Sequence, residues 1–199
     1  MEPLEPITLT TGRLLLRPFT PDDTDTVYEA CQDPDIQRWT VVPSPYARTD
    51  AEFFTERLSP EGWRDGSMYN FAVVPREGGP LIGALGINRR TGPGLYEVGF
   101  WTAKEQRGRG FMTEAVLCAA RWSFTALGCD RLEWKAETGN VPSRAVALRA
   151  GFRMEGEQRS GLLNKGVRRD AWMGALLPAD LGLPGTAAYV PQGGVSAAP

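Results

Sequence analysis

The stretch Lys104-Glu105-Gln106-Arg107-Gly108-Arg109-Gly110-Phe111-Met112-Thr113-Glu114-Ala115 decides how this chain folds and what it binds. The apolar run before it, Val98-Gly99-Phe100-Trp101, predicts a buried strand, and apolar residues at helical spacing after it predict a helix (Val116, Ala119, Ala120, Phe124 and Leu127). Glycines let a backbone approach a ligand closely, and the first N–H groups of a helix lack intrahelical partners and carry positive partial charge. The stretch therefore predicts an anion site, although Gly-x-Gly at such a junction is equally typical of a plain tight turn.

Two familiar phosphate motifs do not fit this stretch. No Gly-Lys-Ser/Thr follows the turn, so it is not a P-loop. Thr113 stands where a dinucleotide fingerprint has its third glycine, and no first βαβ unit surrounds the turn. We therefore expect the anion to be neither a Mg-nucleoside triphosphate nor NAD.

The composition of the 199 residues indicates one folded domain, because 42% are hydrophobic and 23% charged, as in ordinary globular proteins. The net charge of −2 argues against nucleic-acid binding, which needs a basic face. A small anionic ligand stays possible, because arginines gather around two glycine-containing turns (Arg107, Arg109, Arg144, Arg149 and Arg153). No signal segment opens the chain and no apolar run reaches about 18 residues, so we expect a cytoplasmic protein that does not bind membranes.

The chain contains no histidine, which excludes Ser-His and Cys-His nucleophiles and argues against a zinc site. Its three cysteines (Cys31, Cys118 and Cys129) have no metal or redox spacing, so we expect no bound metal. Cys118 lies on the apolar helix and is interpreted as a core residue. Acid–base chemistry is left to carboxylates, hydroxyls, tyrosines or lysines.

The apolar pattern predicts an antiparallel meander before the glycine turn and a strand–helix–strand unit with parallel strands around it, a mixed α+β architecture. Ligands bind at the carboxyl ends of parallel strands, which is where the turn falls. We expect a domain over residues 1–178 and a poorly ordered Pro/Gly/Ala-rich tail over 179–199. The expected strands are 14–19, 69–74, 81–87, 96–101, 132–136, 152–159 and 170–177, and the expected helices are 21–31, one within 36–46, 51–58, 113–127 and 142–150.

A second cap-rich turn, Asn140-Val141-Pro142-Ser143-Arg144-Ala145, opens the later helix, which ends at Ala150-Gly151-Phe152. Asn and Ser are natural cap residues, Pro142 fits a first turn and Gly151 fits the position after the last turn. Capping alone explains these residues, and a ligand that touches both turns would also explain them.

Together these blocks resemble the Gcn5-related N-acetyltransferase (GNAT) superfamily over residues 12–177, and most of all its branch of ribosomal-protein N-terminal acetyltransferases, the Rim type. The resemblance implies the GNAT fold, a central, mostly antiparallel twisted sheet with a splayed parallel strand pair and flanking helices. Each block is weak alone, and their order and spacing are specific. The blocks are Thr11-Gly12-Arg13-Leu14, Leu16-Arg17-Pro18, Asp33-Pro34, Glu97 to Trp101, Arg107 to Ala115, Asn140 to Ser143, Gly151-Phe152 and Arg168-Arg169-Asp170.

The same resemblance implies roles for these residues. The glycine turn would hold the pyrophosphate of acetyl-CoA through backbone N–H groups; Glu105 stands where the wider superfamily prefers Gln or Arg, which points to the backbone rather than that side chain. Asn140 would bind the cofactor arm, Ser143 would protonate the leaving thiolate, and Glu97 would accept the proton of the amine. The full cofactor-binding set is Phe100, Trp101, Thr102, Arg107, Gly108, Arg109, Gly110, Phe111, Met112, Thr113, Asn140, Ser143 and Arg149.

The resemblance thus predicts an enzyme that moves an acetyl group from acetyl-CoA to a primary amine, either a protein N-terminus or a small molecule. Another acyl-CoA, an acyl-carrier protein as donor, or a sensor that binds acyl-CoA without turnover are the alternatives. A homodimer is compatible with the sequence. Trp39, Tyr46, Trp63 and Tyr69 would either line the acceptor site or pack in the core. Ser143 and Glu97 also have plain structural interpretations, as a cap residue and as a surface carboxylate.

Overall fold

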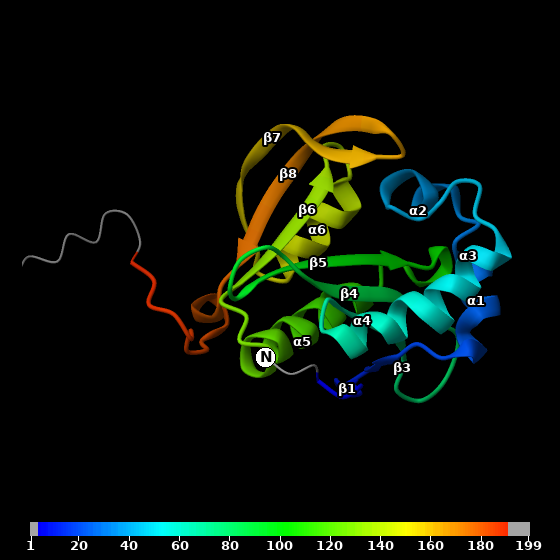
Figure 1. The fold of residues 1–199 in the computed structure, drawn as a ribbon, viewed down its shortest axis with the longest axis horizontal. Helices are drawn as coiled ribbons and strands as arrows, with labels where there is room; N and C mark the ends of the chain where they lie inside the picture. Colours follow the sequence, from blue (N-terminus) through cyan, green and yellow to red (C-terminus); the bar gives the residue numbers. More distant parts are fainter. Residues whose placement is uncertain (1–3, 191–199) are drawn as a thin grey trace, which may run out of the picture.

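The computed structural model describes residues 4–190, which form one mixed sheet with helices on both faces (Figure 1). Within this described part, eight strands lie in the order β1-β2-β3-β4-β5-β6-β8-β7, and only β5 and β6 run parallel. The predicted meander and the predicted parallel pair around the long helix are therefore confirmed. The strands are β1 (Leu9–Thr10), β2 (Leu14–Pro18), β3 (Met68–Pro75), β4 (Gly83–Arg89), β5 (Leu95–Thr102), β6 (Arg131–Glu137), β7 (Arg153–Asn164) and β8 (Val167–Leu176).

All the predicted helices are present, with differences at three places before the predicted tail. The helix predicted within 36–46 begins at Pro34, the short turn at 104–106 was not predicted, and the helix predicted at 51–58 is longer. The segment expected to end at Leu58 continues to Asp65, because Pro60 lies in a first turn, where its missing N–H costs nothing, and Gly66 (φ 70°) ends the helix. The helices are η1 (Pro21–Asp23), α1 (Thr24–Ala30), α2 (Pro34–Trp39), α3 (Arg48–Glu52), the π-helical η2 (Phe53–Leu58), α4 (Ser59–Asp65), η3 (Lys104–Gln106), α5 (Phe111–Ala126), α6 (Val141–Arg149) and η4 (Pro178–Leu181).

Two apolar clusters cover the two faces of the sheet. On one face α5 and α6 pack against alternate strand residues such as Leu85, Val98 and Trp134. On the other face α1, α2 and α3 pack against Ala72 and Ala84 through a smaller cluster. Helix α5 is therefore the central helix of the larger core, and its first turn is fixed beside the end of β5.

Helix α4 covers the edge of β3 where β2 no longer pairs with it. β2 reaches only as far as Phe71, and beyond that point the indole N–H of Trp63 donates to the Asn70 carbonyl at 3.1 Å. A Cβ on Gly62 would lie 2.7 Å from the Met68 carbonyl oxygen, so only glycine permits this close packing. Helix α4 thus covers this strand edge and provides a hydrogen bond to one of its carbonyls without another strand.

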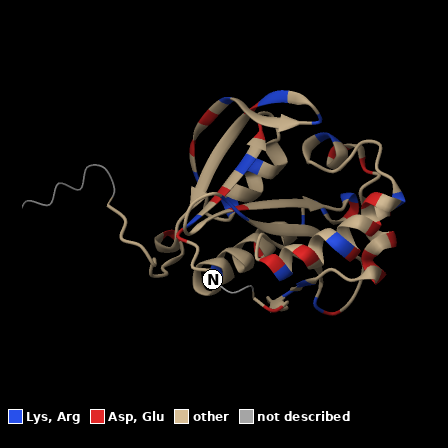
Figure 2. Ribbon diagram, viewed as in Figure 1, with Lys and Arg blue, Asp and Glu red and all other residues tan. Residues whose placement is uncertain are grey.

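The hairpin of β7 and β8 is longer than the sequence predicts. β7 runs from Arg153 to Asn164 and is mostly exposed, so its outer half shows no apolar alternation from which a strand could be predicted. Two register shifts interrupt its pairing with β8. Charged residues of both signs occur along the hairpin (Figure 2), which protects its free edge against pairing with other chains.

The predicted tail makes contacts with the domain over its described part. Residues 178–181 form η4, Asp180 pairs with Arg153 at 2.8 Å, and Leu181 and Leu183 pack against the larger core. The Thr186 hydroxyl and the N–H groups of Thr186 and Ala187 donate to Asp130. The contacts of this segment with the domain therefore extend past residue 178, and residues 191–199 lie outside the described part. Within residues 4–190, no helix has the length and apolar character needed to cross a membrane.

Candidate active site at the splayed strand pair

The two parallel strands separate halfway along their length. Their pairing runs from Leu95 opposite Arg131 to Val98 opposite Trp134 and stops there, although β5 continues to Thr102 and β6 to Glu137. The other edge of β5 stays paired with β4 as far as Thr102. The backbone of 99–102 therefore faces a gap in the sheet, which confirms the predicted splay.

The glycine turn at the end of β5 presents unpaired backbone N–H groups. Gly108 and Gly110 have φ angles of 74° and 75°, in the left-handed region that favours glycine, and Gly110 is the N-cap residue of α5. Among residues 4–190, none of the N–H groups from Gly108 to Thr113 donates to a protein acceptor; the next one, of Glu114, bonds the Gly110 carbonyl at 3.2 Å. Six consecutive donors at a helix N-terminus form a nest for an anion.

The side chains of this turn differ in how deeply they are buried. Phe111 and Met112 are buried in the larger core, so only their backbone is available to a ligand. The guanidinium groups of Arg13 and Arg109 lie over the Phe111 ring, 4.7 and 4.6 Å from its centroid. Arg13 also donates to the Arg109 carbonyl at 3.2 Å. Arg13 is a charge at the site that was not among the predicted site residues; its only sequence signal was its place in the opening Thr-Gly-Arg-Leu block.

Glu114 attaches the beginning of the chain to the first turn of α5. Its carboxylate accepts the Thr11 hydroxyl at 2.5 Å and pairs with Arg13 at 2.6 Å. Burial alone would raise the pKa of Glu114, yet hydrogen bonds from Thr11 and Arg13 outweigh it and leave the pKa below its ordinary value. The ionised carboxylate therefore holds the β1–β2 turn, and with it Arg13, beside the glycine turn.

The side chain of Arg107 points away from the open N–H groups. Its Nε donates to the Thr102 carbonyl at 3.1 Å, and its two terminal nitrogens pair with Asp33 at 2.9 Å and Asp35 at 3.1 Å. The predicted cofactor contact of Arg107 is through its backbone N–H, and this N–H donates to the Lys104 carbonyl at 3.4 Å. The Arg107 guanidinium and the Thr102 carbonyl both form hydrogen bonds within the protein.

The first turn of α6 lies on the other side of the gap. The Asn140 side-chain oxygen accepts the Ser143 N–H at 3.2 Å, as expected of a cap, and Asn140 is buried. The Ser143 hydroxyl oxygen accepts the indole N–H of Trp134 at 3.0 Å. Trp134 is the last β6 residue paired with β5, so Ser143 lies at the point where the strands separate. A hydroxyl that accepts this bond keeps its own proton free to donate.

Glu97 and Ser143 lie on opposite faces of the sheet. Val98 and Trp134 face α5 and α6, so Glu97 points to the face that carries α1, α2 and α3. Both Glu97 carboxylate oxygens bond Arg90, at 2.6 and 3.2 Å. Arg90 was not predicted; it lies near the β4–β5 turn, and only the antiparallel pairing brings it to Glu97.

Beside Glu97, the surface of the sheet is formed by glycines rather than by residues with larger side chains. Gly99 lies opposite Gly86 on β4, and a Cβ on Gly99 would meet only the Asn88 amide, at 3.9 Å. The next two residues are half-buried, Phe100 against the larger core and Trp101 against the smaller one. A small group can therefore approach the β5 backbone closely at Gly99.

Several other predicted residues lie away from the gap. Arg149 is exposed in the last turn of α6, at the opposite end of that helix from Asn140. Tyr46, Trp63 and Tyr69 are buried, which confirms their interpretation as core residues, whereas Trp39 is half-buried at the end of α2.

The thiols are not reactive groups. Burial raises the pKa of Cys31 and of Cys129 to about 12, and it raises the pKa of Cys118 as well. All three cysteines are therefore expected to stay protonated at neutral pH.

The comparisons with known proteins agree with this geometry. The model of the family described as Acetyltransferase (GNAT) domain matches residues 13–153. The uncharacterized N-acetyltransferase p20 of Bacillus licheniformis is 28% identical over 171 residues, which cover 85% of this chain and 96% of that protein. A Vibrio cholerae structure, provisionally described as a ribosomal-protein-serine acetyltransferase, is 26% identical with a TM-score of 0.78 and covers 89% of this chain and 100% of its own. Mycobacterium smegmatis RimJ, solved in complex with CoA-disulfide, has a TM-score of 0.76 at 24% identity over 92% of both chains and so shares the fold.

Proposed function

Because this chain belongs to the GNAT acetyltransferase family, we propose that it transfers the acetyl group of acetyl-CoA directly to the α-amine of a protein or peptide N-terminus. The observation that carries this proposal is the run of open N–H groups from Gly108 to Thr113, directly beside the gap between β5 and β6. The proposed acceptor is supported by the likeness to a protein described as a ribosomal-protein-serine acetyltransferase.

The glycine turn fits the pyrophosphate of the donor. Six open N–H groups and the dipole of the 16-residue helix α5 favour a multiply charged anion, and Arg13 and Arg109 add two positive charges nearby. CoA in the RimJ structure supports the same class of ligand for this fold. The gap beyond Val98 and Trp134 would receive the pantetheine arm, and the side-chain N–H of Asn140 would hydrogen-bond it.

The groups proposed to transfer protons lie on opposite faces of the gap. The amine nitrogen attacks the thioester carbon, the carbon–sulfur bond breaks, and the sulfur leaves as a thiolate. Ser143, on the α6 face, donates its hydroxyl proton to that thiolate while Trp134 holds its oxygen. A backbone N–H of β5 near Trp101 stabilises the negative charge that develops on the carbonyl oxygen.

Glu97 would accept the proton of the amine on the opposite face. Arg90 contacts both carboxylate oxygens, and each oxygen keeps a free lone pair, so the proton can reach Glu97 directly or through a water. An α-amine has a pKa near ~8, so roughly a tenth is neutral at pH 7, whereas a lysine near ~10.4 is almost wholly charged. An enzyme for α-amines therefore depends on its base less than an enzyme for lysines does.

Thiol release on mixing the protein with acetyl-CoA and a peptide panel tests this function. We expect release with peptides that have a free N-terminus and none with N-terminally blocked peptides that retain a lysine. Glu97→Gln is expected to lower the α-amine rate by about 10-fold, less than the ~10²–10⁴-fold of an essential general base. Release only with small amines would overturn the acceptor class, and CoA binding without release for any acceptor would show a sensor instead.

A further inference from the structure

Helix α2 makes an ionic contact with the end of β5. Asp33, its N-cap residue, pairs with Arg107, which in turn donates to the last carbonyl of β5, that of Thr102. The Asp33 side chain is 7% exposed, and its second oxygen accepts the Asp35 N–H at 2.7 Å. Both oxygens of this nearly buried carboxylate are thus engaged, one within α2 and one outside it.

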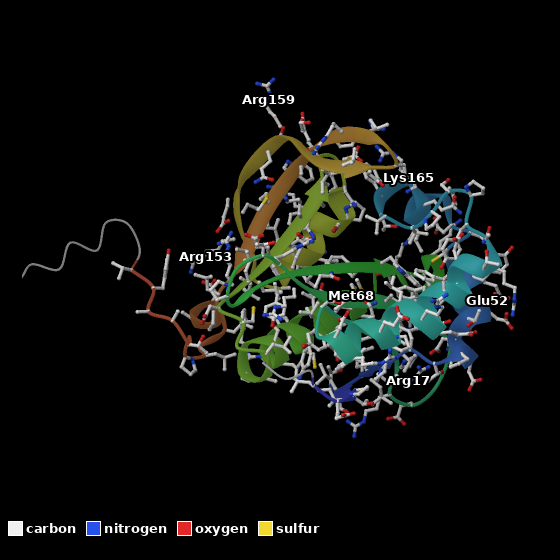
Figure 3. The ribbon with its side chains drawn as sticks, viewed as in Figure 1. Arg17, Glu52, Met68, Arg153, Arg159 and Lys165 are labelled. Carbon is white, nitrogen blue, oxygen red and sulfur yellow. The ribbon has the colours of Figure 1, made fainter. Side chains whose placement is uncertain are left out.

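The same helix makes a second ionic contact with the end of β6. Arg38 pairs with both oxygens of Glu137, at 2.8 and 2.7 Å, and Glu137 is 9% exposed. Lys165, at the tip of the β7–β8 hairpin, donates to the Gln37 and Thr40 carbonyls at 2.5 and 2.9 Å (Figure 3). A Cβ on Gly139, just after β6, would lie 3.8 Å from the Trp39 ring.

These contacts join two strand ends that have no hydrogen bonds to each other. β5 and β6 stop pairing at Val98 and Trp134, and their ends are connected instead by the chain Thr102–Arg107–Asp33–α2–Arg38–Glu137, here called the α2 bridge. Glu137 projects from the same face of β6 as Glu97 does from β5. The bridge therefore crosses the gap on the face that we assign to the amine.

We propose that the α2 bridge sets the width of the gap between β5 and β6, and that Arg107, Asp33, Arg38 and Glu137 are positioning residues for acetyl transfer. This inference rests on the proposed function. A bidentate arginine–carboxylate pair fixes both distance and orientation, which a water-filled gap cannot do. Misplacement of reacting groups by about 1 Å can lower a rate by ~10²-fold, so the bridge acts on turnover. Pyrophosphate binding rests on the Gly108–Thr113 backbone and does not need it.

Breaking one end or both ends tests the bridge. Asp33→Asn keeps the cap, since Asn and Asp cap equally well, and removes the nearly buried ion pair of Arg107. The pair of Arg107 with Asp35 stays, but Asp35 is 67% exposed, and exposed ion pairs contribute little. Arg38→Gln removes the other pair. Each variant is expected to lower kcat by about 10-fold with the acetyl-CoA Kd within about threefold of wild type. Because a bridge needs both ends, the double variant is expected to lose about 10-fold as well, whereas independent effects would multiply to about 100-fold.

A control variant and a measurement that does not depend on enzyme turnover complete the test. Asp25→Asn removes an exposed carboxylate that pairs with Arg48 away from the gap, and it should leave kcat unchanged. In hydrogen exchange of the free protein, Asp33→Asn should speed exchange of the Asn140 N–H, which bonds the Glu137 carbonyl at 3.0 Å on the far side of the bridge. Rate losses that multiply in the double variant would overturn the proposed role of the α2 bridge. An unchanged exchange rate of the Asn140 N–H would also overturn it. If the wild-type protein transfers no acetyl group, only the proposed function is contradicted, because the exchange measurement still tests the bridge.

Discussion

The two helices that begin beside the gap differ in whether a side chain caps their first N–H groups. Helix α5 begins at a glycine without a side-chain cap, and the N–H groups of Gly108 to Thr113 stay open. Helix α6 begins at Asn140, whose side chain accepts the Ser143 N–H. An open N-terminus can bind an anion through the backbone, whereas a capped one presents only its side chains. In the proposed function, charge binding therefore belongs to α5 and proton donation to α6.

The largest effect is expected from closing the open N-terminus. Gly110→Val forces a β-branched residue to φ 75°, which costs about 1–2 kcal/mol of folding free energy and distorts the nest. We expect calorimetry to show at least a ~100-fold loss of CoA affinity, since several charge-assisted hydrogen bonds are lost together. Gly92→Val is the matched control, because Gly92 also has a positive φ (123°) but lies in the β4–β5 turn, with open space around its Cβ position. Equal CoA affinity in both variants would refute the anion site.

A smaller effect is expected at the capped N-terminus. Ser143→Ala removes the proposed proton donor and leaves the indole N–H of Trp134 without its acceptor. We expect kcat to fall by about 10-fold, less than the ~10²–10⁴-fold typical of general acid–base catalysis, with the acetyl-CoA Kd unchanged. Ser143→Thr keeps a hydroxyl and should recover most of the rate. If Ser143→Ala turns over at the wild-type rate, Ser143 only accepts the bond from Trp134.

Asn140→Asp separates capping from ligand binding. Aspartate caps as well as asparagine and suits the positive end of the helix dipole, but it cannot donate a side-chain N–H. The free energy of unfolding should stay within about 0.5 kcal/mol of wild type, while acetyl-CoA affinity falls by roughly 10-fold, as expected for one lost hydrogen bond. An unchanged affinity would leave Asn140 with capping as its only role.

The smallest effect concerns the attachment of α5 to the β1–β2 turn. Glu114→Gln loses the ion pair with Arg13 and should cost about 1 kcal/mol of folding free energy at pH 7. Because the pKa of Glu114 is lowered in the folded protein, its contribution is present above the unfolded pKa near ~4.3 and is lost as the pH falls through the folded value. Denaturant unfolding at pH 7 and below pH 4 should therefore show the difference disappearing in acid, and a constant difference would contradict this account.

The local features of the site could be predicted from the sequence, because short-range chemistry fixes them. Gly108 and Gly110 take φ angles that favour glycine, and Asn140 caps the helix that it begins. The parallel pair also followed from the order of strand, helix and strand. The partners of charged side chains could not be predicted. Arg107 lies 74 residues from Asp33, and no local pattern indicates that its guanidinium turns from the anion site toward α2.

The sequence by itself therefore determined the family, the order of the strands and helices and the open N-terminus of α5, since these depend on residues close together in the chain. Only the tertiary structure decided that Arg13 lies beside that N-terminus, that Glu97 and Ser143 occupy opposite faces of the gap, and that α2 joins its two sides. The physical reason is distance along the chain. Ion pairs between residues far apart in sequence form only when the sheet brings their strands and helices together, so no periodicity or motif encodes them.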